Sequence, residues 1–172
     1  MADSSPSFGW GHINLNVSDL DRSIAFYRLF GFDIFLPGIP YLGLSLEAEA
    51  APLSSNMCEA LGIPAGTTGR ACIMDLDDGF PKLDLTEFSG TSGTAPLTNG
   101  DRGLVRICLT SEDLAADVAR LKDAGVEFIT EAKSGHGDLA DIAVCRDPDG
   151  ALIEIIQVYL DRWASLLGAQ EG

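Results

Sequence analysis

Four charged or titratable side chains lie at positions where strands are expected. His12 begins the segment HINLNV and Arg106 begins RICLT, each on the polar face of an alternating pattern. Glu87 and Glu154 lie within the apolar runs LDLTEF and ALIEIIQV. An ionised carboxylate among apolar neighbours is costly unless it pairs with a cation or binds a metal. We therefore expect the four side chains to form one polar site.

The chemistry of this site depends on Arg106. Imidazole and carboxylate groups bind divalent ions such as Zn, Ni, Mn or Fe, so His12, Glu87 and Glu154 are the predicted metal ligands. A guanidinium stays protonated and has no lone pair for a metal. Two interpretations follow. In one, the three ligands hold a metal with open positions, and Arg106 contacts an anionic substrate group. In the other, Arg106 pairs with Glu87 or Glu154 and replaces the metal.

The segments that must position these groups occur twice. HINLNVSDLDRSIAFYRLFGFDIF aligns without a gap with RICLTSEDLAADVARLKDAGVEFI, at an offset of 106 − 12 = 94 residues. Each copy predicts a strand, a helix capped by Ser18 or Ser111, a glycine at the helix end and a short strand. Hairpins follow at 72–76 with 82–88 and at 142–146 with 151–158. In this alignment Glu87 matches Glu154, at an offset of 67.

The repeat predicts an α+β fold of two tandem βαβββ modules that form a curled, mixed-sheet cup within a single domain. The first module is residues 1–90 and contains an insertion at 36–69, in which 55–61 could form a short helix ended by Gly62. This insertion is either a binding lid or a structural flap. Residues 91–102 are the expected linker, 103–160 the second module, and 161–172 a C-terminal helix or tail.

Further polar residues are expected near the site. By strand alternation, four side chains share a face with His12 or Arg106 and are either substrate contacts or satisfied interior polar groups: Asn14, Asn16, Cys108 and Thr110. His136, in the loop KSGHGDLAD, is predicted as an additional acid, base or ligand, with simple exposure as the alternative.

The composition limits which classes of binding partner we expect. The chain has 172 residues, 46% hydrophobic residues and a net charge of −15, which disfavours nucleic acid and anionic membranes. We find neither a secretory signal nor an apolar run long enough to span a bilayer, and expect a cytoplasmic protein. The four cysteines form no CxxC pair and are expected to be free thiols. GxGxxG and GxxxxGK[ST] are absent, so we expect no nucleotide cofactor.

From about Trp10 to Tyr159 the chain resembles the vicinal oxygen chelate superfamily, which includes glyoxalase I, epimerases, extradiol dioxygenases and bleomycin resistance proteins. The stretches most similar to the family are HINLNVSDLDRSIAFYRLFGF and CRDPDGALIEIIQ. The resemblance implies paired modules around a metal, with ligand positions at His12, Glu87, Glu154 and position 106, which is often His. It also implies that homodimers are common. Arg106 departs from that pattern.

The leading functional hypothesis is an enzyme of lyase, isomerase or epimerase type that acts on a small oxygenated metabolite. Glu154 or Glu87 would remove a proton beside a carbonyl, and Arg106 or a metal would stabilise the enolate. One alternative is a non-catalytic protein that binds small antibiotic-like molecules. A second is an extradiol-type dioxygenase, which usually needs two histidines and one carboxylate at iron.

Overall fold

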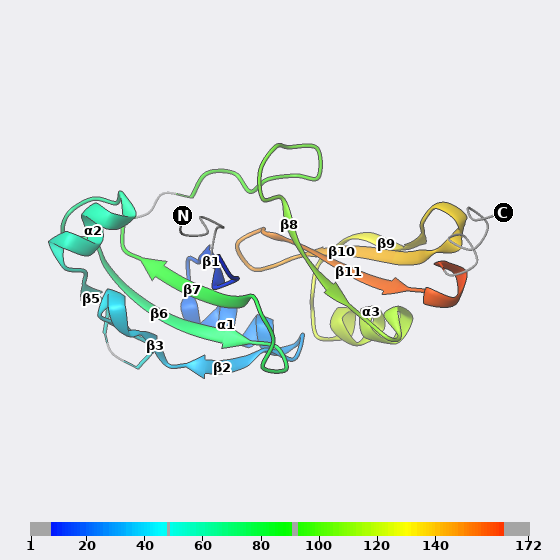
Figure 1. Ribbon diagram of the computed structural model, residues 1–172, viewed down its shortest axis with the longest axis horizontal. Coiled ribbons are helices and arrows are strands. Elements are labelled where there is room, and N and C mark those ends of the chain that lie inside the picture. Colours follow the sequence, from blue (N-terminus) through cyan, green and yellow to red (C-terminus); the bar gives the residue numbers. More distant parts are fainter. Residues whose placement is uncertain (1–7, 48, 91–92, 164–172) are drawn as a thin grey trace, which may run out of the picture. The chain divides into compact units, whose positions relative to one another are not determined.

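The computed structural model describes residues 8–47, 49–90 and 93–163. The chain divides into two compact units, Met1–Ser92 and Gly93–Gly172. Each unit pairs a mixed β-sheet with a helix that connects its first two strands (Figure 1). The α+β fold predicted from the repeat is thereby confirmed.

The main sheet of the first unit has the order β1-β7-β6-β2, and a short strand β5 also pairs with β6. β1 runs parallel to β7, whereas β6 is antiparallel to both β7 and β2. The elements that build it are β1 (His12–Asn16), α1 (Leu20–Arg28), β2 (Asp33–Leu36), β6 (Thr68–Asp75) and β7 (Lys82–Phe88).

Helix α1 forms because its apolar residues recur at helical spacing. Leu20, Ile24 and Tyr27 are buried. The side chain of Asp19 accepts a hydrogen bond from the backbone N–H of Arg22, so the cap lies one residue after the expected Ser18. After the helix, Gly31 adopts a φ of 92°, a conformation that glycine reaches without steric cost.

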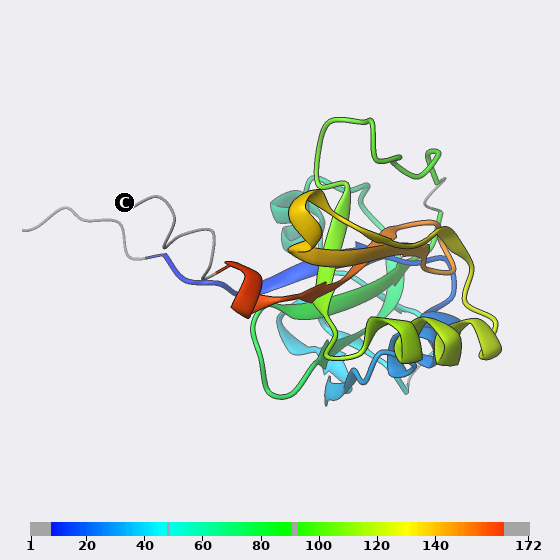
Figure 2. The same cartoon turned by 90° about the vertical axis from the view of Figure 1, so that its right-hand side faces the viewer.

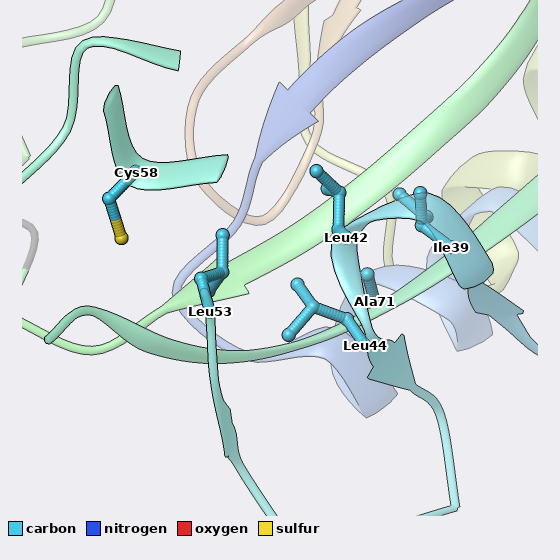
Figure 3. Close-up of a cluster of buried hydrophobic side chains, with 6 residues drawn as sticks. All are labelled: Ile39, Leu42, Leu44, Leu53, Cys58 and Ala71. Atoms are coloured by element: carbon cyan, nitrogen blue, oxygen red, sulfur yellow. The ribbon is translucent and has the colours of Figure 1, made fainter. Parts of the chain in front are cut away.

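The insertion packs against β6 of the main sheet through a shared apolar cluster. It contains β3 (Gly38–Ile39), the 3₁₀ turn η1 (Pro40–Leu42), β4 (Leu44–Ser45), β5 (Ala51–Pro52) and α2 (Ser55–Leu61). Figure 3 shows its apolar cluster, formed by Ile39, Leu42, Leu44, Leu53, Cys58 and Ala71. The helix at 55–61 and its end at Gly62 are as expected. This packing favours the structural flap over the binding lid.

The second unit repeats the arrangement without the insertion. Its sheet order is β8-β11-β10-β9, with β8 parallel to β11. Figure 2 shows α3 running along this sheet. The helix contacts β9, β10 and β11, and its residues Leu114, Val118 and Leu121 are buried. The elements are β8 (Arg106–Thr110), α3 (Leu114–Asp123), β9 (Phe128–Ser134), the 3₁₀ turn η2 (His136–Asp138), β10 (Ala140–Arg146) and β11 (Leu152–Val158). Asp113, rather than the expected Ser111, caps α3.

The described part of the expected linker packs on the second unit. Asp101 accepts hydrogen bonds from the backbone N–H and hydroxyl of Thr98, at 2.7 and 2.8 Å. Pro96 lies so close to Gly150 that a Cβ at residue 150 would be 2.4 Å from the Pro96 Cγ. Residues 93–102 are therefore anchored by defined contacts.

Only the start of the expected C-terminal helix can be described. Residues 160–163 are helical, and 164–172 lie outside the described residues. The indole N–H of Trp163 donates to the Leu139 carbonyl at 3.0 Å. Among the described residues, no helix has the length and apolar character needed to cross a membrane.

Candidate functional site

An arginine–carboxylate pair marks the sheet of the second unit. Arg106 begins β8 opposite Leu152 of β11, two residues before Glu154. The Arg106 Nε donates a hydrogen bond to Oε2 of Glu154, and its Nη1 donates to Oδ1 of Asn99 at 3.1 Å. The side chain of Glu154 is 14% exposed and that of Arg106 is 41% exposed. A cation and a carboxylate thus meet at a surface that a small molecule can reach.

Cys108 contacts the other oxygen of the same carboxylate. Its thiol donates to Oε1 of Glu154, with a sulfur–oxygen distance of 3.4 Å. Burial and the negative charge of Glu154 raise the pKa of Cys108 to about 11. Cys108 is therefore a thiol rather than a thiolate at neutral pH, and both oxygens of Glu154 take part in hydrogen bonds.

A histidine–carboxylate pair lies on the corresponding strands of the first unit. The Nε2 of His12 on β1 is 3.4 Å from the Oδ2 of Asp84 on β7. The hydroxyl of Tyr41, which comes from the insertion, donates to the same oxygen at 3.5 Å. The Oδ1 of Asp84 is buried and has no hydrogen-bond partner among the described residues.

The environment of Asp84 disfavours its charge. The residue is 1% exposed, and burial raises the pKa of its carboxyl, against the opposing effects of His12 and of the Tyr41 hydrogen bond. Asn14 holds the neighbouring backbone, since its Nδ2 donates to the Thr86 hydroxyl at 3.0 Å and to the Asp84 carbonyl at 3.4 Å. The contacts of Asn14 are thus with the protein itself.

The strand register corrects the match that sequence alignment predicts between Glu87 and Glu154. His12 pairs with Lys82 and its counterpart Arg106 pairs with Leu152, so the offset between β7 and β11 is 152 − 82 = 70 residues. Asp84 is therefore the counterpart of Glu154. The signal was present in the sequence, because Leu83–Asp84–Leu85 repeats as Ile153–Glu154–Ile155.

Glu87 has a different counterpart and a different contact. At the same offset it corresponds to Gln157. The Oε2 of Glu87 accepts the backbone N–H of Leu20 at 2.8 Å, and the Oε1 of Gln157 accepts that of Leu114 at 3.0 Å. Each side chain binds the first residue of a helix, where N–H groups lack intrahelical acceptors. The role of Glu87 as a ligand or base stays a prediction.

The structure does not bring His136 to the Arg106–Glu154 pair. His136 lies in η2, before Ala140, which pairs with Val158 at the far end of β11. Val158 is six residues from Leu152 on the same strand, or roughly 20 Å at about 3.3 Å per residue. Asn16 and Thr110 are exposed on the faces of His12 and Arg106, as strand alternation predicts.

The side chains present in the second unit do not fit a divalent ion. Arg106 cannot donate a lone pair, and Glu154 is engaged by Arg106 and Cys108. In the first unit, His12 and the unpartnered oxygen of Asp84 offer two donors. Within the described part of the chain, no group of three or more His, Cys, Asp or Glu residues is placed to hold a metal.

Comparison with the sequences of known protein families shows which superfamily the chain belongs to. The model of the glyoxalase/bleomycin resistance protein/dioxygenase superfamily matches residues 9–155. The chain belongs to this superfamily. A lactoylglutathione lyase of Pseudomonas putida is 28% identical over 160 residues, which are 90% of this chain and 87% of that protein. A second lactoylglutathione lyase, from Pseudomonas aeruginosa, is 34% identical over 83 residues, 46% of each chain.

Solved structures agree with the superfamily fold. A glyoxalase family protein from Bacillus cereus has a TM-score of 0.71 at 18% identity and covers 92% of this chain and 98% of its own. A glyoxalase I from Leishmania major, described as trypanothione-dependent, has a TM-score of 0.60 at 21% identity, covering 96% and 97%. At such identities the likeness shows the fold alone.

Proposed function

We propose that this superfamily member is an enzyme of lyase or isomerase type that acts on a small metabolite with two neighbouring oxygens. It removes a proton from the carbon beside a carbonyl and stabilises the enolate with Arg106. The observation that carries the proposal is the contact between Arg106 and Glu154, which puts a base and a fixed cation side by side. The similarity to lactoylglutathione lyases supports the reaction class.

The proposed step uses two side chains of the second unit. The Glu154 carboxylate takes the proton, and the electron pair of the broken C–H bond moves onto the carbonyl oxygen. The Arg106 guanidinium stabilises that oxygen because it is aimed at developing negative charge before the reaction begins. In a substrate with a hydroxyl on the carbon that loses the proton, the hydroxyl proton moves to the enolate oxygen. Glu154 then returns its proton to the former carbonyl carbon, and the hydroxyl-bearing carbon becomes the new carbonyl, which completes an isomerisation.

The first unit has a polar pair of its own. Within this unit we propose His12 as a contact for a small molecule, with Asp84 holding the imidazole and Tyr41 holding Asp84. Asp84 thereby takes the place that sequence alignment gives to Glu87. Thr110 is proposed as a further substrate contact of the second unit, and Asn16 as a further small-molecule contact of the first. No step is assigned to a metal, because the donor set of the second unit does not fit one.

The test is proton exchange by the full chain in deuterated buffer, followed by NMR. Adducts of 2-oxoaldehydes with glutathione and simple 2-oxo acids serve as substrates, and lactoylglutathione formation is measured in parallel. Glu154→Gln should lower exchange at least about 100-fold, the usual scale of general-base catalysis. Glu127→Gln, which alters an exposed glutamate of the same unit, should leave it unchanged.

Two outcomes would reject the proposed lyase or isomerase activity. Binding of these compounds without exchange or product would favour the non-catalytic binding protein. Oxygen consumption with a catechol, dependent on added iron, would favour the dioxygenase. Homodimer formation and a cytoplasmic location stay predictions that size-exclusion chromatography and cell fractionation can examine.

A further inference from the structure

We propose that Arg106 and Asn99 form a metal-independent binding site for a planar, anionic pair of neighbouring oxygens, such as a 2-oxo acid or its enolate. This inference rests on the proposed function and narrows its substrate class. The guanidinium would hold the two oxygens that a chelating metal would otherwise hold.

Arg106 has hydrogen-bonding capacity beyond its protein contacts. A guanidinium carries five N–H donors in a rigid plane. Glu154 takes the Nε donor and Asn99 takes one donor of Nη1, so the second donor of Nη1 and both donors of Nη2 lack an acceptor among the described residues. Because the fork geometry of arginine matches two oxygens in one plane, a carboxylate or an enediolate is the expected ligand.

The protein fixes the orientation of this guanidinium. An arginine side chain loses rotational freedom about several bonds when it binds a ligand, and this loss of entropy weakens the binding of small ions. Here Glu154 restrains Nε from the neighbouring strand, and Asn99 restrains Nη1 from the segment before β8. The plane of donors is thus set before a ligand arrives.

Asn99 belongs to an ordered turn. Thr98 and Asp101 flank it and are joined by three hydrogen bonds between 2.7 and 3.0 Å. The Asn99 carbonyl oxygen is committed to Arg106, whereas no hydrogen bond joins its Nδ2 to another described residue. The amide can therefore donate to a ligand beside the guanidinium, which adds a neutral contact to a charged one.

The charge balance explains why an anion can bind in an acidic protein. The net charge of −15 opposes anions at long range. That repulsion is screened within about 8 Å at physiological salt, so short charge-assisted hydrogen bonds dominate at the site. Glu154 offsets part of the charge of Arg106, and we accordingly expect weak, millimolar binding.

The experiment is calorimetric titration of the full chain with oxalate, a planar dianion that resembles a 2-oxo acid enolate, in the presence of a metal chelator. Wild type should bind with a dissociation constant in the millimolar range. Arg106→Gln should weaken binding at least tenfold, and Arg106→Lys should also weaken it because an ammonium cannot form the two-point contact. Asn99→Ala should weaken it about threefold. Arg120→Gln, on α3 in the same unit, is the matched control and should bind as wild type does.

Three results would overturn the inference: no binding by wild type, binding only when the chelator is replaced by a divalent metal, or equal binding by Arg106→Gln. If Arg106→Gln fails to fold, Asn99→Ala decides, since residue 99 lies outside the sheet. Turnover of a neutral adduct without oxalate binding would leave the proposed function in place and reject the inference. Oxalate binding without any turnover would support the inference and reject the enzyme.

Discussion

At the scale of single residues, Asp84 combines burial with an incomplete hydrogen-bond set. A carboxyl whose pKa is raised in the folded state binds protons more readily there than in the unfolded chain. Its contribution to stability is therefore full below the unfolded pKa and is lost as the pH rises through the folded pKa. Functional sites retain a buried carboxyl of this kind although it lowers the stability of the fold at neutral pH.

Asp84→Asn should consequently raise the free energy of unfolding at pH 7 relative to wild type. The stability difference should shrink as the pH falls toward the ordinary aspartate range, where both side chains are neutral. Urea unfolding at a series of pH values measures it. Asp33→Asn, which alters an exposed aspartate, is the control, and a destabilised Asp84→Asn at pH 7 would contradict the prediction.

Cys108 provides a second residue-scale prediction. It is exposed, whereas Cys58, Cys72 and Cys145 are buried, so a thiol reagent should label it first in the native protein. With a pKa of about 11, labelling should be slow at neutral pH and should rise about tenfold per pH unit. Glu154→Gln should speed labelling several-fold, because removing the negative charge favours the thiolate. Mass spectrometry of the labelled peptide gives the rate, and an unchanged rate would show that the Glu154 contact is absent.

At the scale of elements, Glu87 and Gln157 make the same contact with a helix N-terminus, one in each unit. Each accepts the first backbone N–H of a helix, one with a carboxylate and the other with an amide. Glu87→Gln should therefore keep activity and change the free energy of unfolding by at most about 1 kcal/mol, since it keeps the acceptor and loses only the ion pair with Arg70 at 3.8 Å. Glu87→Ala should lose about 1 kcal/mol more, the usual effect of removing an acceptor at a helix N-terminus. Loss of metal or activity in Glu87→Gln would restore this residue as a ligand or base.

Gly150 tests the anchoring of the segment before β8. Its φ is 91°, and a Cβ there would meet Pro96. Gly125 has a similar φ of 88° but has nothing within 4 Å of the added atom, so Gly125→Ala measures the backbone strain alone. Gly150→Ala should cost about 1–3 kcal/mol more than this control, because of overpacking. Differential scanning calorimetry compares the two, and equal costs would show that Pro96 does not pack on the hairpin.

The elements themselves were predictable where a periodic pattern repeats. The strand alternation at 12–16 and 106–110, both helices and the hairpin of 142–146 with 151–158 follow from local sequence. The register between β1 and β7 was not predictable from hairpin spacing, because parallel pairing joins residues about 70 positions apart. Asn99 and Tyr41 were missed for the same reason: only the folded chain brings them to Arg106 and Asp84.

At the scale of the whole molecule, the net charge determines how the stability of the fold depends on salt. The 26 acidic residues outnumber the 11 basic ones, and the resulting charge of −15 repels itself more strongly in the compact state than in the expanded one. The ion pairs at the surface offset little of this, since exposed pairs contribute about 0–1 kcal/mol each. Salt should therefore weaken repulsion more than attraction.

We expect the melting temperature at pH 7 to rise when sodium chloride is increased from low to moderate concentration, and to level off once the screening length falls below the spacing of neighbouring acids. A change of about 1 kcal/mol corresponds to roughly 2–4 °C for a chain of this size. Lowering the pH toward the isoelectric point of about 4.2 should reduce the salt effect, because the net charge vanishes there. A melting temperature that falls with salt at pH 7 would mean that attractive pairs such as Arg106–Glu154 and Arg70–Asp21 outweigh the repulsion among the acids. The oxalate titration should be repeated over the same salt range. Screening should raise the melting temperature of the whole protein while it lowers the affinity of Arg106 for oxalate.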